Sequence, residues 1–157
     1  MIPLYKTLGY LGAVPFYLCA FGMLAFHDGW LASMFQTVIV VYAGLILAFM
    51  GGVHWPQSFP RSSEGQMLLS IGSSLLAFTL TLLALFSLYG GWFGGALHLI
   101  VMSLCLALYI LGFVFMYAFD LQSLDQEDFP DDYMDFRMKV TIFVCIALLG
   151  ALISLWM

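Results

Sequence analysis

Apolar side chains fill five long stretches of the chain, at residues 8–26, 35–53, 67–89, 93–119 and 138–157. The hydrocarbon core of a membrane is about 30 Å thick, and an α-helix crosses it in roughly 20 residues. The stretches lack the alternating pattern of barrel strands, and backbone polar groups in lipid must be paired within the protein. The pattern therefore predicts an all-α, polytopic membrane protein, a bundle of five transmembrane helices.

The polar segments between these stretches are short. None is long enough to hold a second hydrophobic core, so residues 1–157 are expected to form a single transmembrane domain. Residues 54–66 contain Pro56 and Pro60, which predict a non-helical connection.

The connection at residues 120–137 is acidic and holds seven of the nine Asp and Glu residues. Residues 123–126 have the spacing of a capping box, which indicates a short helical turn. Pro130 followed by two aspartates predicts that the last helix begins near Pro130. Asp135 and Lys139, four residues apart, are then expected to pair on that helix.

Basic residues fix the expected orientation. Only 8% of the chain is charged, and its four Lys and Arg residues are Lys6, Arg61, Arg137 and Lys139. All four lie on the cytoplasmic side if the N-terminus is cytoplasmic, which satisfies the positive-inside rule. The C-terminus then lies on the opposite side of the membrane.

Small and polar residues inside the stretches recur at helical spacing. In the third stretch a face of hydroxyl and small side chains predicts contact between helices: Ser70, Ser73, Ser74, Ala77 and Thr81. In the fourth stretch one face carries six residues at the same kind of spacing: His98, Met102, Cys105, Tyr109, Gly112 and Met116.

His98 lies on the face of the fourth stretch, about one turn inside the outer interface. An intramembrane ionisable group often has a function, and His27 is expected at a similar depth. If the first and fourth helices touch, the two would form a histidine pair for a b-type haem or a transition metal. Because the chain has only three histidines, a hydrogen-bonded structural role is favoured, and neither a metal nor another cofactor is predicted.

The chain carries no nucleophile elbow, zinc-protease motif, phosphate-binding loop or pair of intramembrane carboxylates. The sequence therefore favours a protein that is not an enzyme. No nucleic-acid partner is expected.

Three elements resemble a known family: residues 8–16, residues 42–55 and residues 133–141. The Gly-Gly-Val-His-Trp sequence that ends the second element is the most distinctive. Together they resemble the small bacterial and mitochondrial membrane family that includes transmembrane protein 69, a family of unknown function. Pro56 departs from the pattern, which has a glycine after the tryptophan. The resemblance implies a multi-pass helical protein of the bacterial inner membrane and brings no activity or catalytic residue.

The resemblance directs attention to residues at, or leading towards, the cytoplasmic face. His54 and Arg137 are expected at similar depth there. The candidate ligand-binding residues of a shared cytoplasmic-side pocket are Tyr42, His54, Trp55, Tyr133 and Arg137.

Two classes of function follow. The favoured one is a non-enzymatic accessory or assembly partner of a larger membrane complex, in contact with membrane lipids and with a membrane protein or a second copy of itself. The alternative is a binder or carrier of a small amphipathic ligand, either a lipid or a quinone; a haem or metal binder is less favoured. A stable protein partner would indicate the first class, and a co-purifying small molecule the second.

Overall fold

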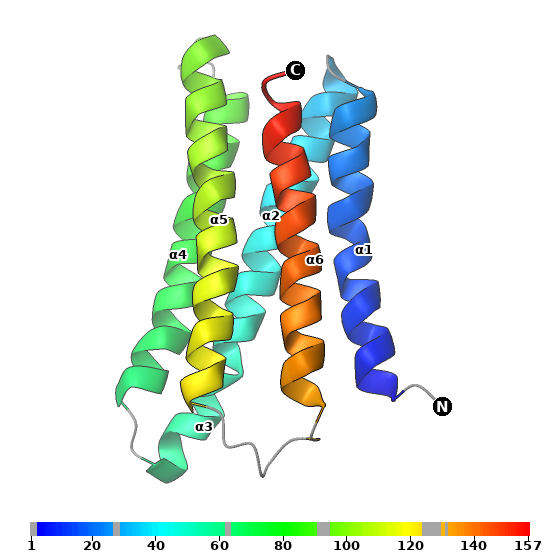
Figure 1. The fold of residues 1–157 in the computed structure, drawn as a ribbon. Coiled ribbons are helices and arrows are strands. Elements are labelled where there is room, and N and C mark those ends of the chain that lie inside the picture. Colours follow the sequence, from blue (N-terminus) through cyan, green and yellow to red (C-terminus); the bar gives the residue numbers. More distant parts are fainter. Residues whose placement is uncertain (1–2, 27–28, 62–63, 91–94, 124–129, 131) are drawn as a thin grey trace.

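The structure, a computed structural model, describes residues 3–26, 29–61, 64–90, 95–123, 130 and 132–157. These residues form five long helices and one short one (Figure 1). The long helices are α1 (Leu4–Ala25), α2 (Trp30–Gly52), α4 (Glu64–Tyr89), α5 (Gly95–Ser123) and α6 (Tyr133–Ser154); α3 (His54–Arg61) is short. All five long helices have the length and hydropathy to cross a membrane, which confirms the predicted five-helix fold.

The long helices run side by side as a closed ring. Around the ring α1 contacts α2, α2 contacts α4, α4 contacts α5, α5 contacts α6, and α6 returns to α1. α2 also contacts α5 across the ring. The two termini lie at opposite ends of the bundle (Figure 1), as expected for an odd number of spans.

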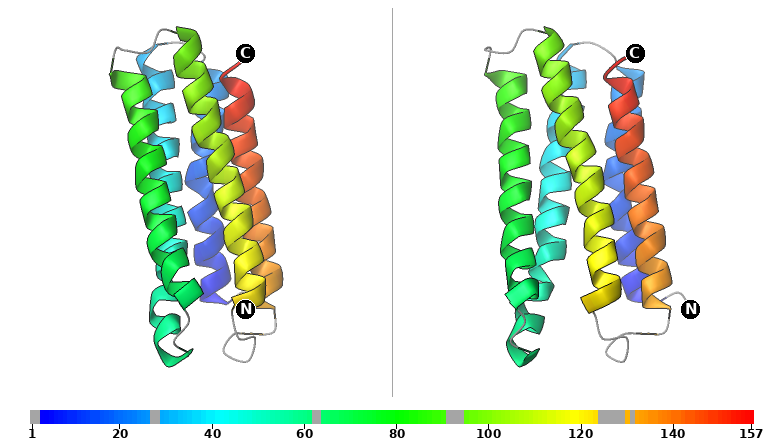
Figure 2. Two further views of the ribbon diagram at one scale, coloured as in Figure 1. Left: turned by 90° about the vertical axis from the view of Figure 1, so that its left-hand side faces the viewer. Right: turned by 60° about the vertical axis from the view of Figure 1, so that its left-hand side comes forward.

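α3 corrects the prediction that residues 54–66 are non-helical. Val53 has helical backbone angles, so the chain passes almost directly from α2 into α3. Pro56 is the third residue of α3, and a proline in the first turn replaces an N–H that would have no partner within that helix. α3 lies at the end of the bundle where α6 begins (Figure 2).

The boundaries of the acidic connection also need correction. Residues 120–123 are the last turn of α5, and α6 begins at Tyr133, whose N–H bonds to the Pro130 carbonyl at 2.8 Å. The predicted pair of Asp135 and Lys139 is present at 2.6 Å. The predicted capping box at 123–126 falls mostly outside the described residues.

Glycines allow close packing of α2 against α4. A Cβ added to Gly51 would lie 2.8 Å from the Ser73 Cβ, and one added to Gly44 would lie 3.4 Å from the Ala77 carbonyl. The adjacent Gly52 has open space at the same position. The small residues of α2 therefore set how closely α4 can approach.

The hydroxyl groups of α4 bond to backbone or across to α5. The Ser73 and Ser74 hydroxyls donate to the Ser70 carbonyl at 3.0 and 3.1 Å. Tyr109 on α5 donates to the Ala77 carbonyl at 3.1 Å and pairs with the Thr81 hydroxyl at 2.7 Å. These contacts agree with the predicted role of this face in helix packing.

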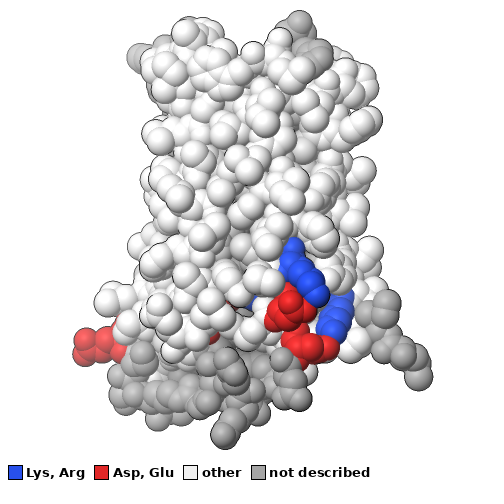
Figure 3. Space-filling view, viewed as in Figure 1, with Lys and Arg blue, Asp and Glu red and all other residues white. Residues whose placement is uncertain are grey.

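Charged side chains gather at one end of the molecule. In the view of Figure 3 the coloured Lys, Arg, Asp and Glu atoms lie near the end where α6 begins, and the rest of the described surface is uncharged. Lys6 of α1 pairs with Asp132, which also accepts a 2.6 Å hydrogen bond from the Tyr5 hydroxyl. These contacts join the start of α1 to the start of α6.

Candidate functional site

His54 is buried at the junction of α2 and α3. Its side chain is 1% exposed, and its ring meets the Phe119 ring edge-on with 5.4 Å between centroids. Gly51 and Gly52 end α2, and His54 is the first residue of α3. The most distinctive element of the sequence resemblance thus places an imidazole inside the bundle.

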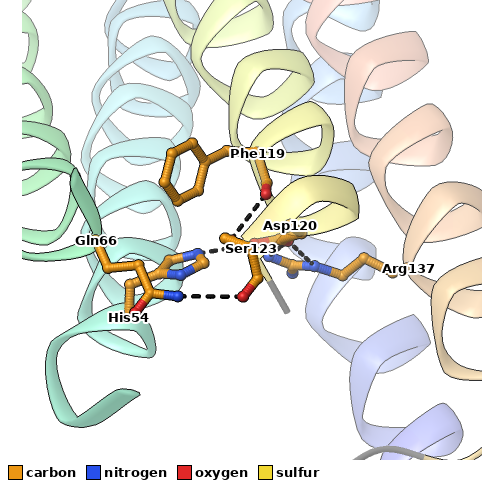
Figure 4. Close-up of polar contacts among 6 residues, drawn as sticks. All are labelled: His54, Gln66, Phe119, Asp120, Ser123 and Arg137. Atoms are coloured by element: carbon orange, nitrogen blue, oxygen red, sulfur yellow. Dashed lines mark hydrogen bonds and ion pairs between the residues drawn. The ribbon is translucent and has the colours of Figure 1, made fainter. Parts of the chain in front are cut away.

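Asp120 of α5 joins His54 to Arg137 (Figure 4). Its Oδ1 atom lies 2.8 Å from His54 Nε2. Its Oδ2 atom accepts from Arg137 Nε at 2.7 Å and lies 2.6 Å from Nη2. Asp120 is 1% exposed, whereas the Arg137 side chain of α6 is 17% exposed. One buried carboxylate therefore connects α3, α5 and α6.

The pairing determines which nitrogen of His54 carries a proton. Asp120 is held ionised by the guanidinium of Arg137, which is always charged. A carboxylate only accepts, so the His54 Nε2–H donates to it. The charges of Asp120 and Arg137 already cancel, and a second proton on the buried imidazole would leave an uncompensated charge. His54 is therefore neutral, with a lone pair on Nδ1.

The Nδ1 atom of His54 has no hydrogen-bond partner among the described residues. Buried polar atoms are nearly always paired, so such an atom needs an explanation. A ligand that bonds to it would supply one.

Two more polar residues complete the group. Gln66 of α4 donates to the Ser123 carbonyl at 3.1 Å, and the Ser123 hydroxyl donates to the Phe119 carbonyl at 2.8 Å. We call the set of His54, Gln66, Asp120, Ser123 and Arg137 the polar cluster. Its members come from four elements at this end of the bundle: α3, α4, α5 and α6.

An apolar cleft of about 370 Å³ lies between α4 and α5, with Leu47 of α2 at its back. We call it the α4–α5 cleft. Its walls include Leu68 and Gly72 of α4 and Gly112, Phe115 and Phe119 of α5. Phe119 thus lines the cleft and also contacts His54. The cleft and the polar cluster share this one side chain as a common wall.

The model of the family described as "Protein of unknown function (DUF3429)" matches residues 1–153. The chain belongs to this family. That finding agrees with the resemblance to an uncharacterised membrane family, while the link to transmembrane protein 69 stays a prediction. No curated protein and no solved structure matches the chain.

Of the candidate residues predicted for this DUF3429 member, the structure brings His54 and Arg137 together through Asp120. Trp55 is next to His54 in sequence and is 41% exposed. Tyr133 lies against Tyr5 of α1, with ring centroids 6.4 Å apart. The pocket as a ligand site remains a prediction.

Tyr42 does not belong to the polar cluster, which corrects its grouping with His54. Its hydroxyl donates to the Gly12 carbonyl at 2.9 Å, and its ring packs on Phe16 in the interior of the bundle. Tyr42 lies about three helical turns before His54, so its side chain acts in the contact between α1 and α2.

Asp120 was missed as a site residue because it was assigned to the acidic connection. A signal was present in the sequence. Asp120 follows Met116 by four residues and so continues the buried face that runs through Met102, Cys105 and Tyr109. An acid in register with a buried helix face is expected to be paired.

His98 pairs with the Ser87 hydroxyl, its Nδ1 lying 3.2 Å from Oγ. This contact joins α4 to α5 and fits the favoured structural role. His27, the other weak metal candidate, lies outside the described residues. Among the residues that the structure does describe, no group of three His, Cys, Asp or Glu side chains is placed to hold a metal ion.

Proposed function

We propose that this DUF3429 member is a multi-pass membrane protein that binds a small amphipathic molecule. The polar head of the ligand reaches the polar cluster, and its apolar part occupies the α4–α5 cleft. The observation that carries this proposal is the unpaired Nδ1 atom of the buried His54, one side chain away from that cleft.

The polar cluster supplies recognition of a head group. Burying an ion pair in a membrane bundle is expensive, and such groups commonly mark ligand or ion pathways. A bond between the ligand head and His54 would pair Nδ1, a buried nitrogen without a partner among the described residues. The Asp120 carboxylate holds the imidazole in a single orientation for that bond.

The cleft supplies recognition of an apolar group. Its volume of about 370 Å³ is within the range of small-molecule sites, roughly 300–1,000 Å³. Gly72 lines it, and a Cβ built on Gly72 would have no atom within 4 Å. A ring or acyl chain can therefore lie directly against the backbone of α4.

We further propose that the charged end faces the cytoplasm and that the protein resides in the bacterial inner membrane. The basic residues support this orientation through the positive-inside rule. Reporter fusions at each terminus test it: the account expects the N-terminal fusion to be cytoplasmic and the C-terminal one to be on the opposite side.

Native mass spectrometry of the protein, gently extracted from its own membrane, tests ligand binding. Gly72→Leu places a side chain in the cleft, and its Cβ meets no atom within 4 Å, so the variant is expected to lose a bound molecule that the wild type retains. Gly12→Leu on α1 is the matched control, because its Cβ also meets open space and it lies outside the cleft.

Retention of the molecule by the wild type and Gly12→Leu, with its loss from Gly72→Leu, supports the proposal. A wild-type protein that carries no molecule, or a Gly72→Leu variant that keeps it, overturns the proposal. The predicted alternative, an accessory partner of a membrane complex, then becomes the better account, and capture of a stoichiometric membrane-protein partner would support it.

A further inference from the structure

The hydrogen-bonding chemistry of His54 restricts the head group of the ligand. The Nε2–H is used by the Asp120 carboxylate at 2.8 Å, and the carboxylate is used in turn by Arg137. A neutral imidazole with its proton on Nε2 offers only a lone pair at Nδ1. That atom accepts a hydrogen bond and cannot donate one.

We infer that the amphipathic ligand presents a hydroxyl group to His54 Nδ1. This inference rests on the proposed function and deepens it by naming the ligand chemistry. A ligand whose head carries only carbonyl or ester oxygens would place its lone pairs against the lone pair of Nδ1. The site therefore selects an alcohol or phenol head over the corresponding carbonyl or ester.

Phe119 is the side chain between the α4–α5 cleft and His54. It separates His54 from the α4–α5 cleft and touches both. The inference requires the partly exposed Phe119 ring to move aside when a head group in the cleft bonds to Nδ1. Next to Phe119 and Asp120 in the same bundle end, Gln66 of α4 donates to the Ser123 carbonyl of α5.

Two kinds of membrane molecule have the required chemistry. A hydroquinone carries phenolic hydroxyls on a ring that would pack against Phe115 and Phe119. A diacylglycerol carries one alcohol on two acyl chains. Each has a partner of nearly the same shape that lacks the hydroxyl: the quinone in the first case, the acetate ester in the second.

The test measures the binding of four probes to the wild-type protein in nanodiscs under argon. The probes are decylubiquinol, decylubiquinone, dioctanoylglycerol and the acetate ester of dioctanoylglycerol. Affinities are expressed per probe dissolved in the bilayer, so that partitioning does not contribute. In at least one pair the hydroxyl form is expected to bind about tenfold more tightly than its partner. The pair in which this occurs shows whether the ligand is a hydroquinone or a diacylglycerol.

His54→Gln is the matched variant. The Gln amide retains an N–H for Asp120 at the place of Nε2 but has no acceptor at the place of Nδ1. It is expected to abolish the preference, so that the hydroxyl form and its partner bind the variant with equal affinity. A thermal unfolding midpoint in detergent close to that of the wild type shows that the variant is folded.

Equal affinities within both pairs for the wild type would overturn the inference. If Gly72→Leu then still removed all binding, the proposed function would stand and only the choice of a hydroxyl head would be wrong. Binding of none of the four probes would also overturn the inference, and native mass spectrometry would decide separately whether the proposed function survives.

Discussion

His54 and Asp120, 66 residues apart in the sequence, lie 2.8 Å from each other, and both are 1% exposed. Asp120 also accepts a hydrogen bond from Arg137 of the last helix. The two contacts link α3, α5 and α6 at the charged end of the bundle. A buried carboxylate with a partner on each oxygen leads to distinct expectations for stability and for binding.

Removing the charge of Asp120 is expected to destabilise the bundle. Asp120→Asn leaves the Arg137 guanidinium without its counter-ion, and breaking a buried pair costs about 3–5 kcal/mol. Unfolding in mixed micelles with increasing SDS measures this loss. The double variant Asp120→Asn, Arg137→Gln removes both charges and is expected to recover most of it; a double variant as unstable as the single one would contradict the charge-pair explanation.

The adjacent glycines at the end of α2 are expected to respond differently to alanine. In Gly51→Ala the new methyl group meets the Ser73 hydroxyl and lies 2.8 Å from the Ser73 Cβ, and overpacking of this kind costs about 1–3 kcal/mol. Gly52→Ala is its control, because open space surrounds the same position. Thermal unfolding in detergent is expected to show a lower midpoint for the first variant and little change for the second. Equal behaviour would mean that α2 and α4 are not packed as described.

Tyr109→Phe tests the hydrogen bonds in the middle of the bundle. The variant keeps the ring but loses the bonds to the Ala77 carbonyl and the Thr81 hydroxyl. A loss of about 1 kcal/mol in unfolding free energy is expected for a buried hydrogen bond. Tyr17→Phe, at an exposed position of α1, serves as control and is expected to have no effect.

Acid is expected to loosen the contact between the starts of α1 and α6. Hydrogen bonds from Lys6 and then Tyr5 lower the pKa of Asp132 below its ordinary value of 3.8. A lowered carboxyl pKa stabilises the folded state above the ordinary value, and that contribution is lost as the pH falls further. The stability difference between wild type and Asp132→Asn should thus be constant near neutral pH and shrink below about pH 3.8. A difference independent of pH down to the acid limit would contradict this account.

The helices could be predicted from hydropathy because each must bury about 20 apolar residues in lipid, and all five long helices are present. The ends of the helices could not be predicted in this way, because the length of an apolar stretch does not show where a helix continues into water. α5 extends to Ser123 and includes Asp120, which the apolar count had excluded. α3 forms despite Pro56, because a proline in a first turn does not break a helix.

The candidate site was predictable only in part. His54 and Arg137, which were expected at similar depth from the sequence, both contact Asp120. Whether the side chain of Asp120 reaches both residues depends on the rotation of α5 about its axis. The run of apolar residues alone does not determine that rotation. Tyr42 was grouped with them by resemblance, but three turns of helix separate it from His54.

The most direct test of ligand binding is a crystal structure of the protein purified from its own membrane and grown in a lipid mesophase. The account predicts a bound molecule in the α4–α5 cleft, in contact with Phe119, with a hydroxyl within hydrogen-bond distance of His54 Nδ1. A cleft closed by its own helices, or one holding only mesophase acyl chains with Nδ1 still unpaired, would contradict it.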